Sequence, residues 1–167
     1  THLYGLLELA KRNRLSNVYV HCFLDGRDTP PTSGKDFVAA LSREMKKIGI
    51  LGGTFNPIHN GHIQLARYCQ NKLGLDKVIF IPTYTPPHKA SVNLADSSHR
   101  ISMCKTAVLS DNNFEVSDIE IRRKGKSYTF ETLNSLKELF PEDTLYLIMG
   151  ADMFLTLADW KNPKVIF

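Results

Sequence analysis

Ile48-Gly-Ile-Leu-Gly-Gly-Thr-Phe-Asn-Pro-Ile-His-Asn-Gly-His62 is the stretch of this sequence that decides the fold. Its apolar beginning predicts a short strand over 47–51 that enters the glycine pair Gly52-Gly53. The chain then turns through Asn56-Pro57, and a helix is expected over 61–73. This order suits phosphate binding, because glycine lets backbone N–H groups approach an anion and a helix N-terminus carries positive partial charge.

Two histidines, His59 and His62, flank the start of that helix. Because they are three residues apart, they lie on one side of the first turn, where they could hold nucleotide phosphates and neutralise charge in a transition state. Half of a zinc site is the alternative. No third or fourth ligand stands at the required spacing, so we expect no metal site. The stretch is not a Walker loop, since no Gly-Lys-Ser/Thr follows the glycines.

The rest of the chain alternates between strand-like and helix-like apolar patterns. Strands are expected over 18–24, 78–81, 114–121 (with a break near Asp118) and 145–149, and helices over 3–12, 35–47, 97–109 and 130–140. Ser97 or Ser98 is the expected N-cap of the helix over 97–109, and Thr129 that of the last helix. Short strands without polar alternation, separated by helices, predict an α/β fold with a doubly wound parallel sheet, whose ligands bind at the carboxyl ends of the strands.

Composition narrows the function classes. The chain has 167 residues, 43% of them hydrophobic, and a formal net charge of +4. No apolar stretch approaches the ~18–20 residues that span a bilayer. The one basic cluster, residues 122–126, has no interleaved aromatic residues, so we expect no nucleic-acid partner. Three widely spaced cysteines predict no disulfide framework and favour a cytoplasmic location.

His59-Asn-Gly-His62 resembles the His-x-Gly-His motif of the nucleotidylyltransferase superfamily, and residues 52–62 look like nicotinate mononucleotide adenylyltransferase in particular. The resemblance extends over 45–167. Further matches follow in the order of that family: Pro86-Pro-His-Lys89, Arg100 with Met103, Ser127-Tyr-Thr-Phe-Glu-Thr-Leu133, Gly150-Ala-Asp152 and Trp160. Arg100 and Met103 would also suit a solvated helix face beside a core position.

The resemblance implies a Rossmann-like fold and adenylyl transfer from ATP to nicotinate mononucleotide, which gives nicotinate adenine dinucleotide and pyrophosphate in NAD biosynthesis. Mg²⁺ is expected to accompany ATP. The implied catalytic residues are His59, His62 and Lys89. The residues implied to bind ATP phosphates are Gly52, Gly53, Thr54, Phe55, His59, His62, His88 and Lys89. Those implied to bind the mononucleotide are Tyr128, Thr129, Asp152 and Trp160.

Residues 1–46 resemble a βα-type fragment of cofactor-independent phosphoglycerate mutase, in which Arg27 and Asp28 match positions that contact phosphoglycerate. We expect no function there, because that family's serine nucleophile and metal ligands are missing. The expected domains are therefore 1–46 and 47–167. The second is expected to be incomplete at the C-terminus, because a Ser/Thr-rich motif ending in Arg normally follows, and the segment after Trp160 is expected to be the next strand.

Two alternative functions stay open. One is a truncated nucleotide-binding fusion product with little or no activity. The other is pantetheine-phosphate adenylyltransferase, although that family typically has Thr where His59 stands. The expected partners are small molecules, without nucleic acid or membrane. The oligomeric state and the preference for the acid or amide mononucleotide stay open.

Overall fold

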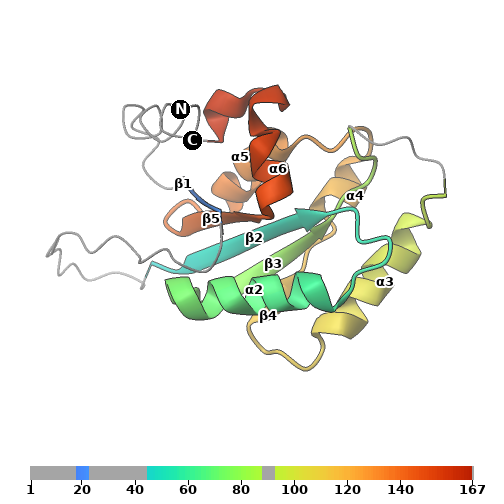
Figure 1. Ribbon diagram of the computed structural model, residues 1–167, viewed down its shortest axis with the longest axis horizontal. Coiled ribbons are helices and arrows are strands. Elements are labelled where there is room, and N and C mark those ends of the chain that lie inside the picture. Colours follow the sequence, from blue (N-terminus) through green and yellow to red (C-terminus); the bar gives the residue numbers. More distant parts are fainter. Residues whose placement is uncertain (1–17, 23–44, 88–92, 167) are drawn as a thin grey trace, which may run out of the picture.

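The computed structural model describes residues 18–22, 45–87 and 93–166. In them a single sheet of five parallel strands, in the order β1-β5-β2-β3-β4, forms the centre of the protein. The strands are β1 (Val18–Cys22), β2 (Lys47–Gly53), β3 (Lys77–Pro82), β4 (Phe114–Val116) and β5 (Thr144–Met149). β2 is the middle strand, so its carboxyl end has a strand on either side (Figure 1).

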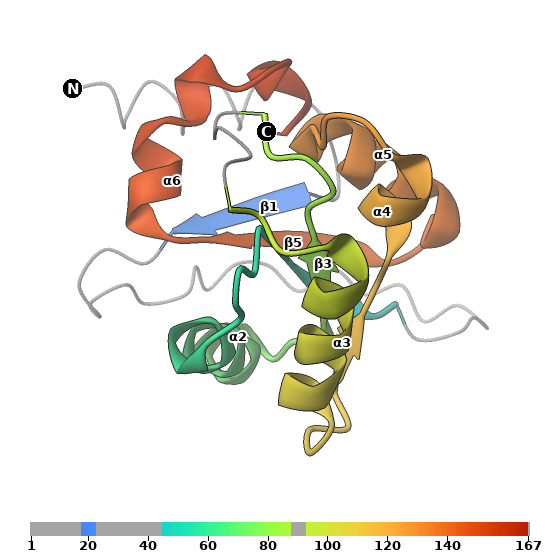
Figure 2. The same ribbon diagram turned by 90° about the vertical axis from the view of Figure 1, so that its right-hand side faces the viewer.

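Helices cover both faces of the sheet. One face carries α2 (Asn60–Leu73) and α3 (Ser97–Val108), and the other carries α5 (Thr129–Leu139) and α6 (Ala151–Leu155), as Figure 2 shows. Successive side chains of β2 point to opposite faces of the sheet. Ile50 packs in the core with α5, and Leu51 packs in the core with α2 and α3. This arrangement confirms the predicted doubly wound parallel α/β fold.

The strand predicted over 114–121 is wrong in its second half. β4 ends at Val116, and a short helix, α4 (Ile119–Arg123), follows. The amide of Arg122 donates to the Asp118 carbonyl at 2.8 Å, and the Arg122 guanidinium pairs with the Asp118 carboxylate at 2.8 Å. Alternating apolar residues suggested a strand there, but these contacts between residues four apart favour a helical turn.

Predicted helix caps also need correction. Asp96, not Ser97 or Ser98, caps α3, because its carboxylate accepts from the Ser98 amide at 2.8 Å and from its hydroxyl at 2.6 Å. These hydrogen bonds lower the pKa of Asp96. Thr129 is the first residue of α5, and Tyr128 is the N-cap.

After Trp160 the chain forms a 3₁₀ turn, η2 (Pro163–Val165), where a strand was expected, and a first 3₁₀ turn, η1 (Leu157–Asp159), precedes it. The helices predicted over 3–12 and 35–47 lie outside the described residues, except for the last positions of the second. None of the described helices has the length and apolar character needed to cross a membrane.

Candidate functional site

Two loops meet at the carboxyl edge of the sheet and form the candidate site. Gly53 pairs with Pro82, so the ends of β2 and β3 lie side by side. Just beyond them, the Thr83 amide donates to the Gly53 carbonyl at 2.9 Å. The glycine loop, residues 52–59, therefore starts directly beside the loop that follows β3.

The two glycines of this loop have different surroundings. A Cβ atom built on Gly52 would meet nothing within 4 Å, and the residue is exposed. A Cβ atom on Gly53 would lie 2.9 Å from Cε1 of Phe55. Gly52 thus leaves its backbone open to a ligand, whereas Gly53 makes room for the phenyl ring.

Phe55 anchors the glycine loop in the protein interior, where only 2% of its surface is exposed. Its ring meets the His62 ring edge-on, with 5.0 Å between centroids and 80° between planes. The side chain of Asn56 ties the loop to the segment before α3, donating to the Asn93 carbonyl at 3.0 Å and accepting from the Ala95 amide at 3.1 Å. The loop is therefore held at both its apolar and its polar residues.

His59 and His62 lie together at the N-terminus of α2. His59 is the N-cap, and the two ring centroids are 3.8 Å apart. The His59 amide donates to Nδ1 of His62 at 3.2 Å. A neutral His62 ring therefore carries its proton on Nε2, which can donate to a ligand. Burial, and to a lesser extent the neighbouring His59, lower the pKa of His62 below its ordinary value of 6.5, which favours this neutral form.

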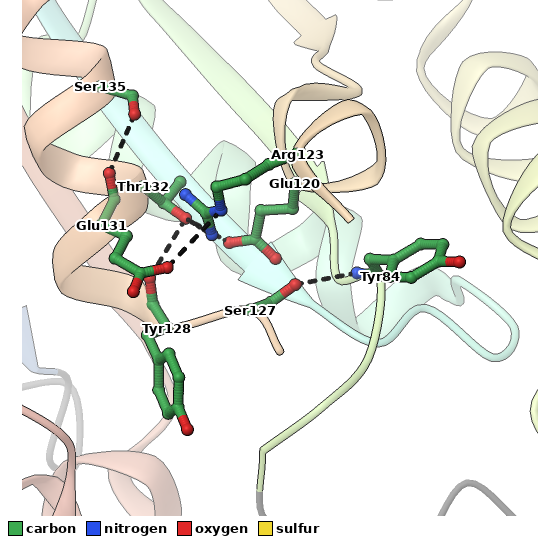
Figure 3. Close-up of polar contacts among 8 residues, drawn as sticks. All are labelled: Tyr84, Glu120, Arg123, Ser127, Tyr128, Glu131, Thr132 and Ser135. Carbon is green, nitrogen blue, oxygen red and sulfur yellow. Dashed lines mark hydrogen bonds and ion pairs between the residues drawn. The ribbon is translucent and has the colours of Figure 1, made fainter. Parts of the chain in front are cut away.

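A third segment, the residues just before α5, packs against the loop that follows β3. The Tyr84 amide donates to the Ser127 hydroxyl at 3.0 Å (Figure 3), and the Ser127 amide donates to the Thr85 carbonyl at 3.0 Å. Thr85 and Lys126 also form an isolated parallel bridge. Tyr128 and α5 follow, so this segment starts the helix on the face of the sheet opposite α2.

Tyr128 lies beside the segment that follows α6. The ammonium group of Lys161 lies 4.2 Å from the centroid of the Tyr128 ring, a cation–π contact. The neighbouring Trp160 is half-buried, packs against the core with α5, and donates from Nε1 to the Thr156 hydroxyl at 3.4 Å. Asp152 is exposed in the first turn of α6, just past the carboxyl end of β5.

A family model described as cytidylyltransferase-like matches residues 50–167. The chain belongs to the cytidylyltransferase-like family. A second model, described as the BPG-independent PGAM N-terminus, matches residues 1–55 of this cytidylyltransferase-like chain, in agreement with the resemblance of its first residues to phosphoglycerate mutase.

Curated relatives of this cytidylyltransferase-like chain are named as known or probable nicotinate-nucleotide adenylyltransferases. The nicotinate-nucleotide adenylyltransferase of Bacillus subtilis is 47% identical over 116 residues, which is 70% of this chain and 61% of that protein. A relative from Clostridium tetani is 48% identical over 118 residues, 71% of this chain and 59% of the relative. The chain thus spans less than two thirds of the length of these relatives.

Solved structures share the fold. Plasmodium falciparum nicotinic acid mononucleotide adenylyltransferase complexed with APC superposes with a TM-score of 0.61, over 73% of this chain and 60% of that chain, at 21% identity. The same enzyme complexed with NaAD gives a TM-score of 0.60 over 71% of this chain and 58% of that chain, also at 21% identity. At this identity the likeness supports the predicted Rossmann-like architecture.

The cytidylyltransferase-like fold brings the residues predicted from sequence into two groups at the carboxyl edge of the sheet. The first group is Gly52, Gly53, Thr54, Phe55, His59 and His62. The second group is defined by its elements on the other face: Tyr128 and Thr129 start α5, Asp152 lies in the first turn of α6, and Trp160 follows η1. His88, Lys89, Arg27 and Asp28 lie outside the described residues. The binding and catalytic roles of all these residues stay predictions.

Arg100 was placed on a solvated face as one possibility, and that placement is wrong because its side chain is only 1% exposed.

Glu120 was missed altogether. It is 6% exposed, and its Oε1 accepts from the Thr132 hydroxyl at 2.6 Å, to which Nη2 of Arg123 also donates at 3.1 Å (Figure 3). A carboxylate flanked by Ile119 and Ile121 was the available signal, but the strand prediction obscured it.

The environment of Glu120 favours its protonated form. Burial raises the pKa of this carboxyl, and the hydroxyls of Thr132 and Ser127, followed by the charge of Arg123 and the hydroxyl of Thr83, offset the effect in part. Its Oε2 has no hydrogen-bond partner among the described residues. Through the Thr132 hydroxyl, Glu120 links α4 to the first turn of α5.

Proposed function

We propose that this chain transfers the adenylyl group of ATP to nicotinate mononucleotide, giving nicotinate adenine dinucleotide and pyrophosphate. The carrying observation is the open backbone of Gly52 beside the paired rings of His59 and His62 at the N-terminus of α2. This geometry would suit a phosphate, and it occurs in a chain that is 47% identical to a Bacillus subtilis nicotinate-nucleotide adenylyltransferase. The NaAD complex of the Plasmodium falciparum enzyme supports the choice of substrate.

The reaction needs positioning more than covalent chemistry. A phosphate oxygen of nicotinate mononucleotide attacks the α-phosphorus of ATP, a new P–O bond forms, and the bond to the bridging oxygen of pyrophosphate breaks. The attacking phosphate is already anionic, so no protein base is required. Nε2 of His62 would donate to a phosphate oxygen, and the N-terminal dipole of α2 would stabilise the charge that builds up.

The other predicted residues have complementary roles in this proposal. Tyr128 and Thr129 would hold the mononucleotide, Asp152 would accept its ribose hydroxyls, and the Trp160 ring would stack on its nicotinate ring. His88 and Lys89 would contact the phosphates from the loop that follows β3.

Mg²⁺ would enter with ATP as part of the substrate. Across the described stretches of chain, no group of three or more His, Cys, Asp or Glu side chains could hold an ion by itself. Mg²⁺ would neutralise part of the charge of the ATP phosphates for the attack. A domain boundary between residues 46 and 47 and a cytoplasmic location are further parts of the proposal. Cys69 and Cys104, both free and buried, are consistent with that location.

The first test is binding of a non-hydrolysable ATP analogue, measured by calorimetry in the parent chain, in His62→Ala and in Gln64→Ala. Gln64 is exposed on α2 and serves as the matched control. Loss of a charge-assisted hydrogen bond should weaken binding by roughly 10- to 100-fold in His62→Ala only. Equal affinities in all three proteins would contradict the role of His62.

The second test is pyrophosphate release from ATP with each candidate acceptor. The proposal expects release with nicotinate mononucleotide and no comparable release with 4′-phosphopantetheine. Preferential release with 4′-phosphopantetheine would identify the other adenylyltransferase. Binding of the ATP analogue without release from either acceptor would leave a nucleotide-binding protein and refute the proposed activity.

A further inference from the structure

Arg100 is a buried cation that donates hydrogen bonds to backbone carbonyls of the site loops and of the segment before α3. Its guanidinium donates from Nε to Ala95 at 2.9 Å and from Nη1 to Thr54 at 2.8 Å. Nη1 also donates to the Thr83 carbonyl at 2.6 Å, and Nη2 donates to that of Tyr84 at 3.2 Å. One side chain thus bonds three separate segments of backbone.

These segments are the ones that build the candidate site. Thr54 belongs to the glycine loop after β2, Thr83 and Tyr84 begin the loop after β3, and Ala95 precedes α3. Through the Tyr84 amide, the same loop is bonded to Ser127, next to Tyr128. The position of Arg100 therefore bears on both groups of predicted site residues.

Burying this side chain is costly, because charged groups lose their hydration. Burial lowers the pKa of the Arg100 guanidinium, and no carboxylate lies within ion-pair distance of it in the described part of the chain. Carbonyl dipoles compensate in place of an ion pair. They can do so only where several carbonyls converge, so the charge favours one arrangement of the loops over others.

We propose that Arg100 is a positioning residue that sets the spacing between the glycine loop and the loop after β3. The inference rests on the proposed function for the identity of the ligand, which is the phosphate chain of a nucleotide. The planar fork of the guanidinium is essential to this role. An ammonium group is a single point of charge and cannot reach carbonyls on three segments in the same geometry.

Hydrogen exchange tests the role without any ligand. The amides of Thr83, Tyr84 and Ser127 are bonded across the loops and report their opening. In Arg100→Met their exchange should accelerate by at least about tenfold, the change expected from losing one charge-assisted hydrogen bond. Arg100→Lys should fall between Arg100→Met and the parent.

The matched control is Val108→Ala, a buried position in the last turn of the same helix. It should lower global stability without selective acceleration at the three reporting amides. The proposal is overturned if those amides keep parental protection in Arg100→Met, or if they accelerate equally in both variants relative to global stability. If Arg100→Met does not fold, Arg100→Lys decides, and parental protection in that variant overturns the proposal.

Calorimetry with the non-hydrolysable ATP analogue adds the functional readout. Affinity should fall by at least about tenfold in Arg100→Met, recover in part in Arg100→Lys, and stay parental in Val108→Ala. Parental affinity in Arg100→Met would overturn the role in ligand binding. If the parent chain does not bind the analogue, the proposed function fails, whereas the exchange measurement still decides whether Arg100 spaces the loops.

Discussion

Replacement by alanine should lower the free energy of unfolding at Gly53 but not at Gly52. At Gly53 the added Cβ would lie 2.9 Å from Cε1 and 3.0 Å from Cζ of Phe55, closer than packed carbon atoms normally approach. Phe55 is 2% exposed, so its ring can move away only by disturbing the core. We expect Gly53→Ala to lower the free energy of unfolding by about 1–3 kcal/mol, the usual range for overpacking.

At Gly52 the added Cβ meets nothing within 4 Å. The free energy of unfolding of Gly52→Ala should therefore stay unchanged or rise by up to about 1 kcal/mol, because alanine restricts the unfolded chain. Affinity for the ATP analogue should nevertheless fall, since the methyl group would occupy space that the phosphates need beside the backbone.

Urea unfolding followed by circular dichroism measures the free energy of unfolding, and calorimetry measures the affinity for the ATP analogue. A loss of 1 kcal/mol corresponds to a Tm lower by about 2–4 °C in a chain of this size, which thermal melting also resolves. Equal destabilisation by the two alanines would refute the packing argument. Parental affinity in Gly52→Ala would refute the claim that phosphates approach the chain at this glycine.

Three further predictions concern His62 and the buried Glu120. Nucleotide binding near pH 6.5 should be accompanied by uptake of a proton, because bound phosphate would raise the lowered pKa of His62. Calorimetry in buffers of different ionisation enthalpy measures this uptake, and a binding enthalpy that is the same in every buffer would contradict the prediction. The pKa of Glu120 is raised on folding, so the contribution of this carboxyl to stability is greatest below pH 4.5 and is lost as pH rises through the pKa of the folded protein. Glu120→Gln should remove this pH dependence from the midpoints of urea unfolding measured between pH 4 and 8. The same dependence of the midpoint on pH in the variant and the parent would contradict this prediction. Thr132→Val removes the donor to Glu120 and should cost about 1–3 kcal/mol by urea unfolding, whereas Thr106→Val, at an exposed hydroxyl, should change stability by less than about 0.5 kcal/mol.

Local patterns were sufficient for the architecture and for the first half of the site. Gly52, Gly53, His59 and His62 are close in sequence, and their arrangement follows from one strand, one turn and one helix start. Runs such as Leu145 to Met149 have no polar alternation, so they had to be strands buried on both faces. A parallel doubly wound sheet then followed, and with it the expectation that a ligand binds at the carboxyl edge.

Long-range contacts decided the rest, because their partners are far apart in the chain. Arg100 reaches Thr54 across 46 residues, and only the folded sheet reveals that its charge is buried against carbonyls. The turn from β4 into α4 depends on Asp118 and Arg122, and the burial of Glu120 depends on α5 packing above it. Sequence periodicity records which residues are apolar, but a buried charge is compatible with the fold only through partners that the tertiary structure supplies.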